Sequence, residues 1–187
     1  MPGEVWLVRH AETDWAKAGK HTGRTDVPLN DDGRAHAASL PQRLSGQRFA
    51  AVYASPLSRA RETAEIAGYG DRAQLLDDLL EYDYGDYEGL TTPEIREQRP
   101  DWFLWRDGVP DGETPDDVGA RTDRVIAKVL ESDGDVALFA HGHVLRVLGA
   151  RWVEQPAALG GRLALSTGAL CRLGFERETR VIRAWNF

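Results

Sequence analysis

The sequence predicts an α/β fold, a three-layer α/β/α sandwich with a mainly parallel central sheet and a small cap region. Two observations carry this prediction. Short apolar runs alternate with helical segments in the first half of the chain, an order that favours parallel strands joined by right-handed crossovers. Two apolar runs also end in a histidine, His10 and His141. Polar side chains gather at the carboxyl ends of parallel strands in such folds, because ligands bind there.

The first half of the chain supplies two strands and two helices. A polar, turn-rich stretch at residues 11–31 separates the first strand from the first helix. Pro41 lies inside the first helix, where it is unfavourable because it has no N–H to donate. The expected strands span 5–8 and 50–54, and the expected helices span 34–44 and 57–67.

The middle of the chain differs from both ends. From residue 81 to 112 it is rich in Tyr, Asp, Gly and Trp, which indicates an irregular segment with short helices. We expect residues 82–112 to fold over the sheet edge as a cap within a single domain of residues 1–187, since 187 residues suit one core. The Trp-rich segment could serve as a lid or as the surface of a homodimer.

The second half supplies a helix with a clear start and a return to strands. Thr114 is a hydroxyl N-cap, Pro115 suits the first helical position, and Asp116 and Asp117 favour the positive end of the helix dipole. A helix is also expected over 143–151. Further strands are expected over 135–140, 163–165, 169–173 and 181–185, the last two as an antiparallel pair.

Composition narrows the class of function. The formal net charge is −7 and the isoelectric point is near 5.3, which argues against a protein that binds nucleic acid or membrane surfaces. No stretch approaches the roughly 20 apolar residues of a membrane span, and no basic leader is visible, so a cytoplasmic location is expected. Cys171 is the only cysteine and lies in an apolar run, which predicts a buried structural thiol and no disulfide.

The residues at the strand ends predict a binding site for an anion. Arg9 precedes His10, and Arg59 lies just after the second strand. Because parallel strands end at the same edge, these residues and His141 should converge on one crevice. Two arginines and two histidines around one point suit a dianion such as phosphate.

Several ordered motifs together resemble one known family. Residues 9–13, Arg-His-Ala-Glu-Thr, resemble the Arg-His-Gly-Glu-Thr signature of the histidine phosphatase superfamily, the phosphoglycerate-mutase-like group. The segments 22–29, 55–64, 81–90 and 140–143 extend this resemblance over nearly the whole chain. Residues 102–108, followed by Gly-Glu-Thr at 112–114, further resemble the short acid-phosphatase and sugar-bisphosphatase branches.

The resemblance implies a phosphatase that works through phosphohistidine without a metal or other cofactor. His10 would be the nucleophile, and Arg9, Arg59 and His141 would hold the phosphoryl oxygens. Glu81 would protonate the leaving alcohol and later accept a proton from water. The substrate would be a small phosphomonoester, a sugar phosphate or bisphosphate. The positions expected to contact it are His21, Thr22, Gly23, Ser55, Gly142 and Arg146.

Four alternatives stay open at this point. A phosphoglycerate mutase is disfavoured by the short chain and by Ala16, which stands where mutases carry an asparagine. A metal hydrolase could use His10, His141 and His143, although Gly142 disturbs that geometry. A relative that binds phosphate without turnover is also conceivable. Finally, neighbouring carboxylates compete with Glu81 as the acid, Asp83 first among them, and His143 is expected to be structural rather than catalytic.

Overall fold

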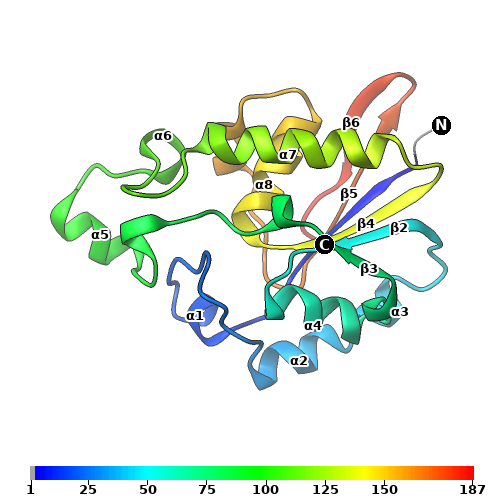
Figure 1. Cartoon of the computed structure of the whole chain (residues 1–187), viewed down its shortest axis with the longest axis horizontal. Helices are drawn as coiled ribbons and strands as arrows, with labels where there is room; N and C mark the ends of the chain where they lie inside the picture. The colour runs from blue at the N-terminus through cyan, green and yellow to red at the C-terminus, as the bar shows by residue number, and fades with distance from the viewer. Residues whose placement is uncertain (1–2) are drawn as a thin grey trace.

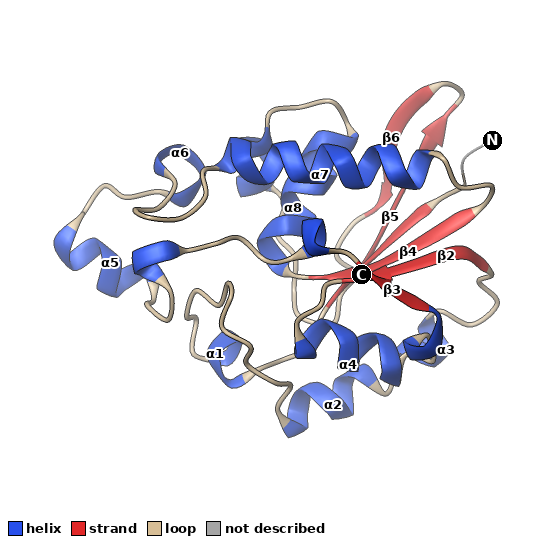
Figure 2. Ribbon diagram, viewed as in Figure 1, coloured by secondary structure: helices blue, strands red, loops and turns tan. Residues whose placement is uncertain are grey.

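A six-stranded sheet forms the centre of the protein in the computed structural model, which describes residues 3–187 (Figures 1 and 2). The strand order is β3-β2-β4-β1-β5-β6. Strands β3, β2, β4 and β1 are mutually parallel, and β5 is antiparallel to both β1 and β6. This arrangement confirms the predicted fold class. The strands are β1 (Val5–Arg9), β2 (Phe49–Ala54), β3 (Ala73–Leu75), β4 (Asp135–Ala140), β5 (Leu170–Glu176) and β6 (Thr179–Ala184).

Helices cover both faces of the sheet, because its central strands are apolar on both sides. In β1, Val5 and Leu7 belong to one hydrophobic cluster, whereas Trp6 and Val8 belong to another, as the two-residue period of a strand requires. Helices α7 (Pro115–Leu130) and α8 (Gly142–Trp152) supply the first cluster. Helices α2 (Asp31–Ala37), α3 (Leu40–Arg43) and α4 (Ser58–Ile66) lie on the opposite face (Figure 2).

The predicted start of the long helix is confirmed. Thr114 caps α7 by accepting a hydrogen bond from the backbone N–H of Asp117, and the Asp117 carboxylate accepts one from the backbone N–H of Thr114. Pro115 occupies the first turn, where its missing N–H costs nothing. Arg121 belongs to the buried stripe of this helix.

The single helix expected over 34–44 is wrong, because two short helices stand there. Helix α2 ends at Ala37 and α3 begins at Leu40. In a continuous helix the residue at position 41 would donate its N–H to the carbonyl of Ala37, and Pro41 has none. The proline therefore lies in the first turn of a new helix, where its shape is tolerated.

The strand expected over 163–165 is also wrong. This segment follows a 3-10 helix, Ala157–Arg162, and its carbonyls bond to side chains instead of a neighbouring strand. Leu165 accepts from Arg9 Nη1, and Ala164 accepts from Trp185 Nε1. Conversely, the edge strand β3 was not expected, since two of its three residues are exposed and carry no apolar pattern.

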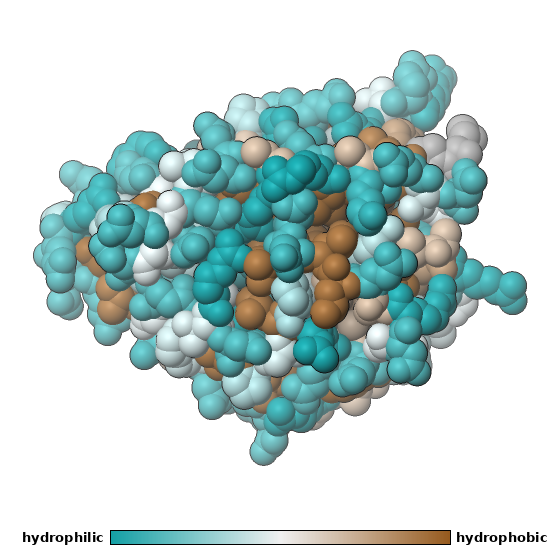
Figure 3. Space-filling view, viewed as in Figure 1, coloured by the Kyte–Doolittle hydropathy of each residue, from teal (hydrophilic) through white to brown (hydrophobic). Residues whose placement is uncertain are grey.

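The remaining helices lie beyond the end of the sheet at which β1 and β4 finish (Figure 1). They are α1 (Asp14–Lys17), α5 (Thr92–Gln98) and α6 (Leu104–Asp107). A 3-10 turn at Gly70–Arg72 lies between α4 and β3, and two more, at Asp77–Leu79 and Gly85–Tyr87, lie between β3 and α5. None of the described helices is long and apolar enough to cross a membrane. The face shown in Figure 3 is largely hydrophilic, with hydrophobic atoms near its middle.

Cys171 is buried as expected, and burial raises the pKa of its thiol to about 11.

Candidate active site

A cavity of about 280 Å³ opens where β1 and β4 end. The two strands are in register, with Arg9 opposite Ala140, and the backbone N–H of His10 donates to the Ala140 carbonyl at 2.9 Å. His10 and His141 therefore both follow this last matched pair, and their ring centroids lie 5.1 Å apart. Of the predicted site residues, Arg9, His10, His21, Thr22, Glu81, Gly142 and Arg146 line the cavity. It is also lined by Ala16, Gly19, Lys20, Tyr84, Thr92, His143 and Leu165.

The hydrogen bonding of His10 sets its tautomer. Nδ1 lies 2.7 Å from the carbonyl oxygen of Ala11. A carbonyl only accepts, so Nδ1 carries the proton and Nε2 keeps a lone pair. Burial, with Arg9 and Arg59 nearby, holds the pKa of His10 well below its usual range. The ring is thus neutral, with a free lone pair on Nε2, even in mildly acidic solution.

Arg9 lines the cavity, and one of its nitrogens has no hydrogen-bond partner. Nη1 donates to the Leu165 carbonyl, whereas Nε is buried without a partner among the described residues. Burial lowers the pKa of this guanidinium, but an arginine stays charged at any pH of interest. A Cβ at Gly142 would lie 3.1 Å from Arg9 Cζ, so glycine leaves this side chain its space.

Arg59, His141 and Ser55 come together behind the cavity and do not line it. Arg59 is fully buried, and its Nε donates to His141 Nδ1 at 3.1 Å. The Nε2 of His141 must then carry the proton, which it donates to Ser55 Oγ at 2.7 Å. Burial, and next the charge of Arg59, holds the pKa of His141 well below its usual range.

The rest of the Arg59 side chain holds the loop that contains Thr22 and Gly23. Its Nη1 and Nη2 atoms donate to the carbonyls of Thr25, Thr22 and Gly23 at 2.9, 3.2 and 2.9 Å. The Gly23 N–H donates to the carboxylate of Glu88, and a Cβ at Gly23 would lie 2.4 Å from the Tyr82 carbonyl. Gly23 therefore shapes the loop from outside the cavity. This use of Glu88 was not anticipated.

Glu81 is the only candidate acid that lines the cavity among the residues that the structure describes. It is 5 % exposed. Its Oε1 accepts from the backbone N–H groups of Tyr82 at 2.8 Å and Val144 at 2.9 Å, and its Oε2 accepts from that of His143 at 2.9 Å. Two of these donors belong to the first turn of α8, whose positive end faces the carboxyl group. Asp83 points elsewhere, toward Gly85 N and Arg24.

On the far side of the cavity, His143 pairs with the buried hydroxyl of Tyr84 through Nδ1. Burial lowers the pKa of His143 and raises that of Tyr84, so both are neutral near pH 7. The Tyr84 hydroxyl donates to His143 Nδ1, because this arrangement gives both groups a hydrogen-bond partner. The neutral His143 ring therefore carries its proton on Nε2. His21 Nδ1 bonds to the Leu90 carbonyl at 2.8 Å. Sequence reasoning gave little weight to His143 and did not identify Tyr84.

Arg146 completes this side of the cavity. Its Nε donates to the Gly160 carbonyl at 2.9 Å, and its guanidinium lies over the Trp105 ring at 4.6 Å. No carboxylate pairs with it among residues 3–187. Trp102 and Trp105 are 3 % and 7 % exposed, so they form the core of the segment at 82–112 rather than an outer surface.

Comparison with known proteins identifies the family of this chain. A family model described as "Histidine phosphatase superfamily (branch 1)" matches residues 5–187. The chain belongs to this superfamily. It is accordingly a phosphomonoester hydrolase, and the family resemblance of its motifs is confirmed.

Individual relatives of this histidine phosphatase are also phosphatases. An acid phosphatase of Mycobacterium tuberculosis is 43% identical over 178 residues, covering 93% of this chain and 87% of that protein. The sedoheptulose 1,7-bisphosphatase of Saccharomyces cerevisiae is 36% identical, covering 78% of this chain and 66% of that protein. The solved structure of an open reading frame from Mycobacterium tuberculosis superposes with a TM-score of 0.92 at 38% identity, covering 100% of this chain and 98% of that one. The structure of a mycobacterial glucosyl-3-phosphoglycerate phosphatase superposes with a TM-score of 0.89 at 26% identity, covering 98% of both chains.

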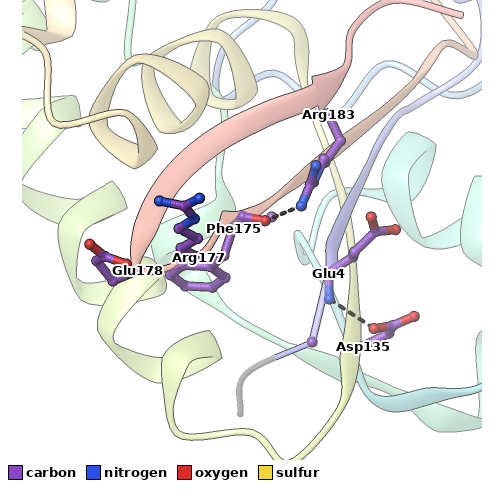
Figure 4. A pocket seen from close by; sticks show the side chains of 8 residues that line it. Glu4, Asp135, Phe175, Arg177, Glu178 and Arg183 are labelled. Atoms are coloured by element: carbon purple, nitrogen blue, oxygen red, sulfur yellow. Dashed lines mark hydrogen bonds between the residues drawn. The ribbon is translucent and has the colours of Figure 1, made fainter.

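A larger cavity of this phosphatase, about 780 Å³, lies near the opposite ends of β1 and β4 beside the β5–β6 hairpin (Figure 4). Its charged lining residues are Glu4, Asp135, Arg177, Glu178 and Arg183, and no histidine lines it. Size alone therefore does not locate the chemistry. Within residues 3–187, no group of three or more His, Cys, Asp or Glu side chains is placed to hold a metal ion.

Proposed function

We propose that this phosphatase hydrolyses a small sugar phosphate or bisphosphate through a phosphohistidine on His10, without a metal ion. The observation that carries the proposal is the Nε2 lone pair of a neutral, buried His10 in the same cavity as the Glu81 carboxyl group and the Arg9 guanidinium, whose Nε has no hydrogen-bond partner in the described chain. These three groups are a nucleophile, an anion binder and a proton donor.

In the first step, His10 Nε2 attacks phosphorus in line with the ester oxygen. The N–P bond forms, the P–O bond breaks, and Glu81 gives its proton to the departing alcohol oxygen. Oε2 of Glu81 has one N–H partner and is the oxygen with room for this proton. Arg9 compensates the charge on the phosphoryl oxygens.

In the second step, water attacks the phosphorus of phosphohistidine. Glu81, now a carboxylate, takes a proton from the water, the N–P bond breaks, and inorganic phosphate leaves with His10 restored. Arg59 and His141 lie behind the cavity wall and act on the phosphoryl group through their electrostatic field. Direct contact by His141 requires its Nε2–H to exchange Ser55 Oγ for a phosphoryl oxygen.

The leaving-group side of the cavity supports a sugar as the alcohol. His21, His143 and Arg146 surround it with polar groups, and the Arg146 guanidinium has no carboxylate partner in the described chain. Such a cation suits a second phosphate or a row of hydroxyl groups. Two of the relatives above act, by name, on a sugar bisphosphate and on a glucosylated phosphoglycerate. Ala16 lines the cavity without offering a polar contact, which favours hydrolysis over a mutase reaction.

The proposal also includes the expectations from the sequence about the cap, the homodimer and the cellular location. Residues 82–112 would act as a cap over the cavity within one domain of residues 1–187. Phe103, 45 % exposed, is the large apolar side chain that this segment offers to a second copy in a homodimer. A cytoplasmic location also stays a prediction.

The test is a turnover screen of sugar phosphates, bisphosphates and phosphoglycerates with and without EDTA, combined with brief labelling by a phosphorylated substrate. The expected result is EDTA-resistant hydrolysis and an acid-labile, base-stable phosphoryl group on His10, absent from His10→Ala. Label on a Ser, Asp or Cys would overturn the mechanism. Phosphate transfer within phosphoglycerate, faster than hydrolysis, would identify a mutase instead. Binding of phosphate esters without turnover would identify a binding protein.

A further inference from the structure

A buried arginine outside the cavity holds the segment that carries Glu81. Arg121 projects from α7 and is 6 % exposed. A guanidinium has five N–H groups, and in Arg121 each of them has an acceptor. Two go to the carboxylate of Glu113 at 2.8 and 3.0 Å. The other three go to the backbone carbonyls of Asp78, Leu80 and Glu81 at 2.9, 2.5 and 3.2 Å.

Glu113 holds the same segment on the other side of Glu81. Its Oε2 accepts from the backbone N–H of Asp83 at 2.8 Å, and its own N–H donates to the Asp83 carbonyl at 3.0 Å. The backbone from 78 to 83 is therefore fastened on both sides of the acid. Residues 80–84 belong to no helix or strand, so no regular hydrogen-bond ladder would otherwise hold them.

We propose that Arg121 and Glu113 form a positioning pair that sets the Glu81 carboxyl group for proton donation. The proposal rests on the role assigned to Glu81 under the proposed function. Arg121 does not line the cavity, so it acts through the backbone of Glu81 and not on substrate. The planar fork of arginine suits this task, because a lysine ammonium offers three donors from a single point.

Loss of this positioning should affect one chemical step, the proton transfer from Glu81 to the leaving oxygen. A proton donor must lie within about 2.6–3.2 Å of the atom it protonates. A displacement of about 1 Å in an active site can cost on the order of 10²-fold in rate. Loosening the 78–83 segment should therefore slow the reaction only where the leaving oxygen needs a proton.

The experiment compares kcat/KM for ethyl phosphate and for p-nitrophenyl phosphate. Since kcat/KM ends at the release of the alcohol, it reports formation of phosphohistidine alone. Ethanol leaves slowly without a proton, whereas p-nitrophenol leaves readily as an anion. The variants are Arg121→Gln, Arg121→Lys, Glu113→Gln and Glu81→Gln. The matched control is Arg124→Gln, because Arg124 also lies on α7 and binds this segment, but only through the half-buried side chain of Asp78.

Arg121→Gln, Arg121→Lys and Glu113→Gln should each lose roughly 10–10²-fold in kcat/KM with ethyl phosphate and less than about threefold with p-nitrophenyl phosphate. Arg124→Gln should change neither value. Arg121→Lys should lose less than Arg121→Gln, because it keeps a charge beside Glu113. In a Glu81→Gln background, Arg121→Lys should add no further loss with ethyl phosphate, since the proton donor is already gone.

Removing one partner of a buried ion pair is strongly destabilising, so the folding of Arg121→Gln is checked before its kinetics are compared. The charge-retaining Arg121→Lys and the isosteric Glu113→Gln then carry the test. Equal losses with both substrates would mean that the pair only supports the fold, and would overturn the inference while leaving Glu81 as the acid. A Glu81→Gln variant with equal losses would instead remove the assigned role of Glu81, and the inference with it.

Discussion

The Nδ1 proton of His10 is donated to the carbonyl oxygen of Ala11, the next residue in the chain, at 2.7 Å. This local bond leaves Nε2 as the free nitrogen. The positive charges of Arg9 and Arg59, added to burial, keep the ring neutral. Tautomer and charge are thus both set before any substrate arrives, and neither depends on a proton relay.

The first prediction concerns the titration of this ring. The pKa of His10 is lowered, so the neutral form should persist as the pH falls below 6.5, and the free lone pair is lost only at the lower folded value. Long-range ¹⁵N NMR of the histidines should show Nδ1 protonated and Nε2 bare in His10 at pH 6.5. His10→Gln assigns the resonance, and the exposed His36→Gln serves as the control. A His10 midpoint at or above 6.5 would contradict the electrostatic argument.

The second prediction concerns the close contact of Gly142 with Arg9. Gly142→Ala would place a Cβ about 3 Å from Arg9 Cζ and push the guanidinium from its place. We expect kcat/KM to fall on the order of 10²-fold, with the same loss for alkyl and aryl phosphates, because charge compensation by Arg9 is needed for both. Gly119→Ala, on α7 and outside the cavity, is the control for a helical glycine. Unchanged kinetics in Gly142→Ala would show that Arg9 does not contact the phosphoryl group.

The third prediction concerns vanadate, which resembles five-coordinate phosphorus. Because Arg9 and His10 already meet in the cavity, vanadate should inhibit competitively and far more strongly than inorganic phosphate, by roughly 10²-fold or more. Arg9→Gln should abolish this difference while Arg172→Gln, which alters an arginine paired with Glu4 far from the site, should keep it. Equal inhibition by vanadate and phosphate in the unchanged protein would argue against an in-line attack by His10.

The fourth prediction concerns stability in acid. His10, His141 and His143 have folded pKa values well below 6.5, so each binds fewer protons folded than unfolded. The stability that these neutral rings contribute is complete above pH 6.5. It is lost progressively as the pH falls toward their pKa values in the folded protein. Each can lower the free energy of unfolding by up to about 1.4 kcal/mol per pH unit in that window. Urea unfolding followed by tryptophan fluorescence should show this slope, and His143→Gln should reduce it. A flat profile from pH 6.5 to 5 would refute the assignment of neutral buried rings.

Local sequence patterns were sufficient for much of the fold. The apolar runs identified β1, β2, β4, β5 and β6, because a strand shows its pattern over a few adjacent residues. The N-cap at Thr114 marked the start of α7 for the same reason. Where a pattern was weak or ambiguous the prediction was wrong. The exposed edge strand β3 lacks an apolar signal, and the segment at 163–165 has the pattern of a strand but gives its carbonyls to Arg9 and Trp185.

For the site, the sequence by itself determined which residues stand at the strand ends. Arg9, His10 and His141 follow from position along parallel strands, since a strand's last residues lie at a known edge of the sheet. Only the tertiary structure decided which of these side chains face the cavity. His141 meets Ser55, 86 residues away, and Arg59 turns to the loop at 22–25, so both stand behind the wall. Glu81 is distinguished from its acidic neighbours by N–H groups of α8, 63 residues distant at Val144. Such partners are set by the packing of separate elements, and no spacing within a single segment encodes them.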